Sequence, residues 1–136
     1  MSRAQQPPGG PLDGYLADPP ELTFPEDWTL SGAWQRAQSA EAHFGPVDDA
    51  HFDVLLERES GDWGDKHRVL FAIQSGQLRA DCDCKSFQHR QWCAHVAHLW
   101  WRWSRDQLGV RDLDADDTHL SPPWWLTVDD AEAARA

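Results

Sequence analysis

The stretch CDCKSFQHRQWCAH, residues 82–95, decides the fold of this chain because it contains all three of its cysteines. Cys82 and Cys84 form a Cys-x-Cys pair, and Cys93 and His95 form a Cys-x-His pair after a spacer of eight residues. Three thiols and one imidazole are the ligands that a tetrahedral structural zinc ion requires. The stretch therefore predicts one Zn²⁺ per chain, held by these four residues.

Other roles for these residues remain open at this stage. Burial as small apolar side chains explains the first cysteine pair, which falls on one face of a strand, but not Cys93. A disulfide would leave an odd thiol, and a redox enzyme more typically has Cys-x-x-Cys at a helix start. His98 lies about one turn beyond His95 and competes as the fourth ligand, and His89 in the spacer is a weaker competitor.

The ligand spacing resembles that of the SWIM zinc finger, which has Cys-x-Cys, a variable spacer and then Cys-x-His. The resemblance covers roughly residues 51–105, and it implies a small stand-alone zinc-finger module that is not an enzyme. SWIM fingers are accessory modules in chromatin-remodelling-type helicases, transposases and recombination factors. The partners that the resemblance implies are therefore DNA, RNA, or a helicase, transposase or recombination protein.

The sequence around the ligands predicts a small zinc-stabilised α+β domain, in which a three-stranded antiparallel β-meander precedes a helix. Alternating apolar and polar residues predict the strands at 51–59, 67–73 and 77–84. The helix is expected at 93–108, with Gly109 as the residue that ends it. An extra helix is expected at 31–44, where Ser31 is a suitable N-cap.

This predicted domain, residues 28–108, has a tail on each side. Residues 1–27 contain six of the nine prolines, so we expect a disordered or loosely docked arm. The residues expected to pin its end to the domain are Tyr15, Leu16, Leu22, Phe24 and Trp28. Residues 109–136 are expected to form a loose acidic tail.

The acidic tail also contains two adjacent tryptophans, Trp124 and Trp125. They are either a clamp that folds back on the domain, which we favour because aromatic side chains are more often buried, or an exposed hook for a partner.

The rest of the sequence argues against catalysis and against membranes. It shows no carboxylate pair, phosphate loop or Ser-His-Asp arrangement, so we expect no enzyme activity and no small-molecule substrate. A thiol enzyme or redox sensor that uses Cys82 and Cys84 is the remaining enzymatic alternative, and its activity would survive zinc removal. No apolar run marks a signal peptide or a membrane span, and we expect a cytoplasmic protein.

Charge is distributed unevenly along the chain. The net charge is −11, yet residues 66–105, here called the basic segment, hold seven Lys and Arg against two Asp. Basic and aromatic residues together are typical of single-stranded nucleic-acid binding. The expected contact residues are Lys85, Arg90, His98, Trp101, Arg102 and Arg105. The alternative is that the basic residues pair with the chain's own acids, which leaves a protein–protein adaptor with no nucleic-acid contact.

Overall fold

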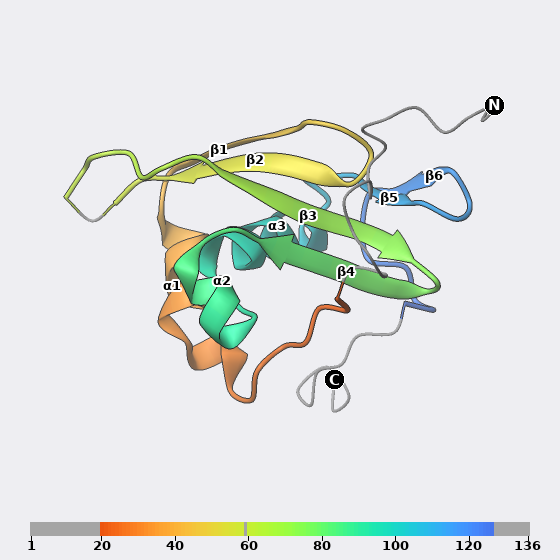
Figure 1. The fold of residues 1–136 in the computed structure, drawn as a ribbon, viewed down its shortest axis with the longest axis horizontal. Helices are drawn as coiled ribbons and strands as arrows, with labels where there is room; N and C mark the ends of the chain where they lie inside the picture. Colours follow the sequence, from red (N-terminus) through yellow and green to blue (C-terminus); the bar gives the residue numbers. More distant parts are fainter. Residues whose placement is uncertain (1–19, 59, 127–136) are drawn as a thin grey trace.

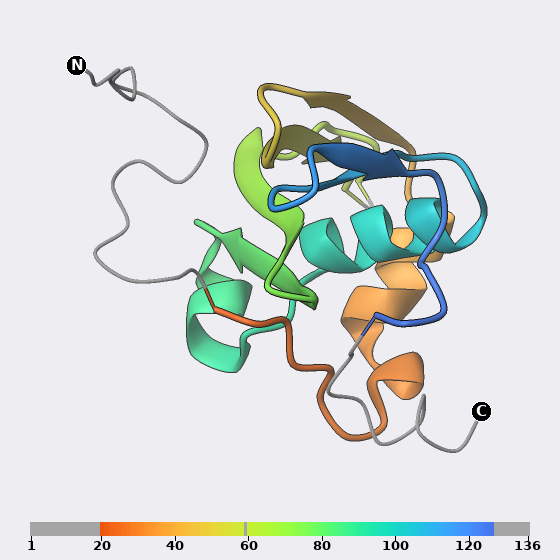
Figure 2. The ribbon, with the colours of Figure 1, turned by 90° about the vertical axis from the view of Figure 1, so that its right-hand side faces the viewer.

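A strongly curled six-stranded sheet wraps around one buried helix, α3 (Ala94–Ser104), in an α+β fold (Figures 1 and 2). This computed structural model describes residues 20–58 and 60–126. The strands are β1 (Ala42–Pro46), β2 (His51–Leu56), β3 (His67–Gln74), β4 (Gln77–Cys82), β5 (Val110–Asp112) and β6 (Asp117–His119). Over the described ranges, no helix is both long and apolar enough to cross a membrane.

Strand β3 is the centre of the sheet because its residues 69–73, Val-Leu-Phe-Ala-Ile, are buried on both faces. One edge of β3 pairs with β4, antiparallel, from Val69 opposite Cys82 to the turn at residues 75–76. The other edge is shared by two strands: β2 pairs antiparallel with its first half, and β5 pairs parallel at Ile73. The three predicted strands thus pair in chain order, but inside a larger sheet.

The free edge of β4 is covered by the end of the N-terminal arm. The Leu22 amide donates to the Leu78 carbonyl at 2.8 Å, and the Ala80 amide donates to the Pro20 carbonyl at 3.1 Å. Of the residues expected to pin the arm, Leu22, Phe24 and Trp28 are buried, and Tyr15 and Leu16 lie outside the described residues. Covering the edge satisfies its backbone groups and removes a site for unwanted strand pairing. The first part of the expected arm, residues 1–19, lies outside the described residues.

The predicted helix at 31–44 is correct only in its first half. Ser31 is its N-cap, and its hydroxyl accepts the Trp34 amide at 3.1 Å. The helix, α1, spans Gly32–Ser39, and Ala42–Pro46 is strand β1 instead. Pairing with β2, which puts Phe44 opposite Val54, gives these residues a full ladder of hydrogen bonds, and this outweighs their helical spacing.

Three further element boundaries differ from the prediction. Strand β2 ends at Leu56, and not at residue 59. Strand β4 ends at Cys82, and not at residue 84, and the spacer between the ligand pairs contains a short helix, α2 (Lys85–Arg90). Helix α3 ends at Ser104, and not near residue 108. Gly109 serves close packing rather than helix termination, because a Cβ there would lie 2.9 Å from Thr118 Cγ2.

The prediction of a loose acidic tail is wrong for its first part, because β5 and β6 extend the sheet. The acidic residues there shape turns: the Asp112 carboxylate accepts the amides of Asp114 and Ala115, at 3.0 and 3.2 Å. The clamp interpretation is wrong for Trp124, which is 94% exposed, and Trp125 is also exposed although it contacts the His119 ring. Residues 127–136 of the predicted tail lie outside the described residues.

Some tryptophans therefore lie in the core and others on the surface. Substituting one of each kind tests this difference in burial. Trp103 is fully buried against Phe71, and its Nε1–H donates to the His119 carbonyl at 2.9 Å. We expect Trp103→Ala to lower the free energy of unfolding by about 3–5 kcal/mol. Trp124→Ala, the matched control, should change it by less than about 0.5 kcal/mol. Equilibrium urea unfolding measures both, and similar values for the two variants would contradict this division.

Candidate metal centre

The four predicted ligands lie at the ends of three elements that meet in space. Cys82 is the last residue of β4, and Cys84 is the N-cap of α2. Cys93 is the N-cap of α3, where its Sγ accepts the Val96 amide at 3.5 Å, and His95 lies in the first turn of that helix. The backbone changes direction at the ends of helices and strands, so the three sulfur atoms and the imidazole can turn toward a common point.

The four side chains, here called the metal cluster, have the geometry of a metal site. Their ligand atoms all lie within 4.8 Å of one another, and Cys82 Sγ is 4.0 Å from His95 Nδ1. All four residues are buried, and the three thiols are free of disulfides. An ion with bonds of about 2.3 Å places tetrahedral ligands about 3.8 Å apart, so a contraction of about 1 Å closes the site. The metal cluster can therefore hold a metal ion.

The electrostatics of the three thiols also favour a cation. Hydrogen bonding to Cys84 raises the pKa of Cys82 to about 12, and burial raises the pKa of Cys93. The pKa of Cys84 is lowered, because its sulfur receives hydrogen bonds from the other two thiols. A divalent ion would supply the positive charge that lets all three ionise and bind.

Helix α2 brings the second ligand pair back to the first. Its buried Phe87 faces the core, and the Gln88 side chain donates to the Cys82 carbonyl at 2.6 Å. The helix ends at Gln91, whose left-handed φ of 58° reverses the chain into Cys93. The spacer is thus a folded connector, and the sequence analysis did not predict this helix.

Neither competing histidine joins the metal cluster. His98 is fully buried on the far side of α3, where its Nδ1–H donates to the Ala37 carbonyl at 2.8 Å and Nε2 accepts from Arg102 at 3.1 Å. Both of its ring nitrogens are occupied, so His98 is wrong as a ligand and wrong as a nucleic-acid contact. His89 is exposed on α2, away from the four ligand atoms.

The sequence analysis missed His67, which lies beside the metal cluster. Its ring centroid is 4.5 Å from that of His95, and its Nδ1 is 2.6 Å from Asp83 Oδ1. Its ligand atom also lies within 4.8 Å of those of Cys82 and Asp83. The β3–β4 register, with Val69 opposite Cys82, could have revealed this position, because His67 then falls level with the Cys-x-Cys pair.

The predicted contact residues do not form one surface. Lys85 and Arg90 are exposed on α2, close to the metal cluster. Trp101, Arg102 and Arg105 lie further along α3, about 9–15 Å beyond His95 along the helix axis at about 1.5 Å per residue. There the guanidinium groups of Arg102 and Arg105 each lie 5.1 Å from the Trp101 ring.

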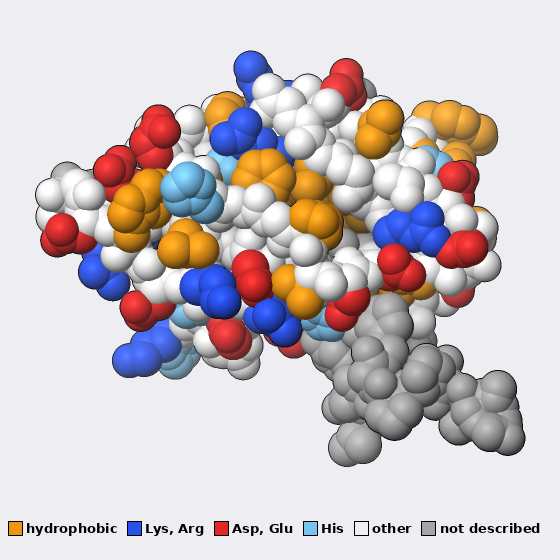
Figure 3. All heavy atoms as spheres, turned by 90° about the horizontal axis from the view of Figure 1, so that it is seen from above, with side chains coloured by type: hydrophobic (Ala, Val, Ile, Leu, Met, Phe, Trp, Pro, Cys, Tyr) orange, Lys and Arg blue, Asp and Glu red, His pale blue; other side chains and the backbone are white. Residues whose placement is uncertain are grey.

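Part of the basic segment pairs with the chain's own acids, as the alternative interpretation expects. Lys66 and Arg68 both form ion pairs with Asp53, and the hydrogen bond from Arg68 holds the pKa of that carboxyl below its ordinary value. Outside the basic segment, Arg111 also pairs with an acid of the chain, Asp116. Seen from above, over β1 and β2, basic and acidic side chains are interspersed (Figure 3). This face therefore has no extended positive field.

Comparison of the chain with protein-family models, with curated proteins and with solved structures found no match. The chemistry of the site must therefore be argued from its own residues.

The buried position of His98, outside the metal cluster, can be tested without measuring any activity. Burial lowers the pKa of His98, so its ring should stay neutral, with the proton on Nδ1, at pH 6.5, where an ordinary imidazole is half protonated. The stability that this neutral ring contributes is present above about pH 6.5 and is lost as the pH falls toward the lowered pKa. Long-range ¹H–¹⁵N NMR correlation reports the tautomer directly, and a protonated ring at pH 6.5 would contradict the buried position.

Proposed function

We propose that this chain is a small SWIM-like module, not an enzyme, in which one structural zinc ion holds a surface that binds a partner. The observation that supports it most strongly is the convergence of three thiols and one imidazole, drawn from both ends of residues 82–95. Four protein ligands leave no open position for a water molecule, which is the arrangement of structural zinc sites and not of catalytic ones.

Zinc suits this ligand set better than harder cations do. Thiolate and imidazole ligands in a tetrahedral arrangement select zinc over magnesium or calcium, which prefer oxygen. Metal binding would also tie β4, α2 and α3 together and supply on the order of 10 kcal/mol of folding free energy. Free, buried thiols fit a reducing compartment, and we propose a cytoplasmic location on that ground.

For the partner, we propose single-stranded nucleic acid, alone or presented by a helicase, transposase or recombination protein. Positive charge near the metal cluster favours it: Lys85 and Arg90 are exposed on α2, and in the described part of the chain neither forms an ion pair with an acidic group. A protein–protein adaptor is the second candidate. The exposed side chains of Leu120 and Trp124, 67% and 94% accessible, favour it because they offer an apolar contact.

Metal analysis of two histidine variants tests the zinc assignment. The wild-type chain should contain one zinc per chain, and His95→Ala should weaken zinc binding by at least about tenfold, because it removes a ligand. His89→Ala, on exposed α2, is the matched control and should retain full binding. Elemental analysis after dialysis against a competing chelator measures both variants.

Cobalt substitution extends the same test. A Co²⁺-loaded chain should show the absorption bands of tetrahedral thiolate coordination, and these should change in His95→Ala but not in His89→Ala. Wild-type protein without zinc, or equal loss in the two variants, would contradict the assignment of the ligands.

A further inference from the structure

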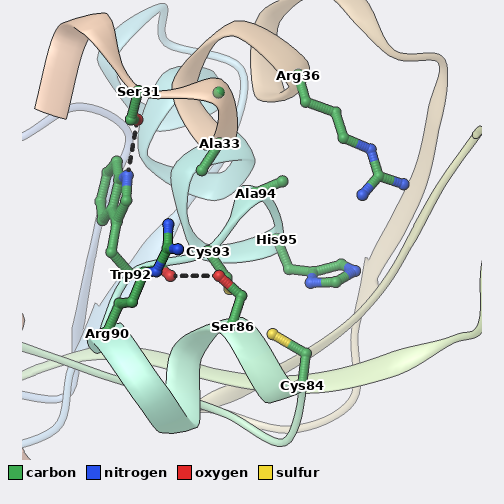
Figure 4. Close-up of a pocket in the computed structure, with 11 residues that line it drawn as sticks. Ser31, Ala33, Arg36, Cys84, Ser86, Arg90, Trp92, Cys93, Ala94 and His95 are labelled. Carbon is green, nitrogen blue, oxygen red and sulfur yellow. Dashed lines mark hydrogen bonds between the residues drawn. The ribbon is translucent and has the colours of Figure 1, made fainter. Parts of the chain in front are cut away.

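A hollow of about 420 Å³ opens beside the metal cluster, between the start of α1, helix α2 and the start of α3 (Figure 4). Its polar lining residues include Ser31, Arg36, Ser86, Arg90 and His95. No Asp or Glu is among the residues that line it. This volume lies within the range of about 300–1,000 Å³ in which proteins bind small ligands.

Two arginines give the hollow its charge. Arg36 reaches it from α1 and Arg90 from the end of α2, on opposite sides in the view of Figure 4. Neither forms an ion pair with an acidic group anywhere in residues 20–58 and 60–126. In a chain with 23 acidic and 12 basic residues, two guanidinium groups that line one hollow and have no acidic partner among the described residues make this hollow a candidate anion site.

The charge of the metal centre does not cancel these arginines. Three thiolates and one Zn²⁺ sum to −1, so the hollow with both guanidinium groups carries about +1. The backbone at the starts of α1 and α3 adds partial positive charge, although helix starts alone would not define a site. Two neighbouring hollows differ, because Asp81 and Asp83 line one of them and Glu57 lines the other, which Arg36 and Arg58 also border. The hollow at Arg36 and Arg90 is therefore the better place for an anion.

We infer that this hollow binds a phosphate group of a single-stranded nucleic acid, with Arg36 and Arg90 as its contacts. The inference rests on the proposed nucleic-acid partner and specifies where that partner binds. Guanidinium groups suit phosphate oxygens because they donate two parallel hydrogen bonds each. The buried Trp92 indole donates to Ser31 Oγ at 3.2 Å, so the bases stack elsewhere and the hollow contacts the backbone. Arg36 lies outside the basic segment, so the charge count along the sequence did not include it. The inferred contact surface also differs from the end of α3, where Trp101, Arg102 and Arg105 lie.

The test compares two sites on the zinc-loaded full chain. Fluorescence anisotropy with a labelled single-stranded oligonucleotide of about 16 nucleotides gives the affinity at low and physiological salt. The double variant Arg36→Gln with Arg90→Gln should bind at least about tenfold more weakly, and its salt slope should fall by about 0.7 for each phosphate that it no longer neutralises. Arg105→Gln, at the far end of α3, is the matched control and should bind like wild type.

Further variants and controls distinguish a loss of affinity caused by lost charge from one caused by misfolding. Arg36→Lys with Arg90→Lys should recover part of the affinity, because it restores the charge without the bidentate geometry. Zinc content and circular dichroism of every variant show whether the fold is kept. Titration with inorganic phosphate alone, followed by calorimetry, distinguishes a free phosphate ligand from a nucleic-acid backbone.

The possible results separate two failures. If the double variant binds like wild type while Arg105→Gln binds weakly, the hollow is not the contact site, but nucleic-acid binding stands. If zinc-loaded wild-type protein binds no oligonucleotide, the proposed partner is wrong and the inference falls with it. Binding of inorganic phosphate without any oligonucleotide binding would also overturn the inference, since the ligand would then be a small anion.

Discussion

The first turn of α3 must meet the end of β4, and most of the structure depends on that contact. Cys82 comes from the strand, Cys93 and His95 come from the helix, and α2 returns the chain between them. Once the start of α3 is held there, Leu99 and Trp103 fall inside the curled sheet and are fully buried. A domain of this size has a small core, so a bound ion at this point would contribute a large share of its stability.

The same contact creates the candidate binding surface. Helix α1 packs against α3, and its start therefore lies beside the metal cluster and α2. Arg36 and Arg90 are far apart in sequence, and they line one hollow only because three helix ends converge on the ligands. Loss of the metal would release those ends from one another. The proposed structural ion would thus act on binding indirectly, because it fixes the distance between two positive groups.

The ligand set and the three central strands could be predicted from the sequence, because each depends on local pattern. Alternation in residues 77–82 reports burial on one face of a sheet, whereas residues 69–73, which were also expected to alternate, are buried on both faces. The two ligand pairs need only a return of the chain between them. The second half of the helix at 31–44 could not be excluded, since Ala40 and Phe44 fit a helix as well as a strand. Strands β5 and β6, three residues each, carry too few side chains to show a period.

The sequence by itself thus determined which residues can bind a metal and which segments alternate, since both follow from residue type and spacing along the chain. Only the tertiary structure decided that Ala42–Pro46 pairs with β2, that His98 is buried between α3 and α1, and that His67 lies against His95. It alone also placed Arg36 and Arg90 in the lining of one hollow. The physical reason is that pairing at a sheet edge and packing between helices depend on neighbours distant in the chain, whose positions no local pattern contains.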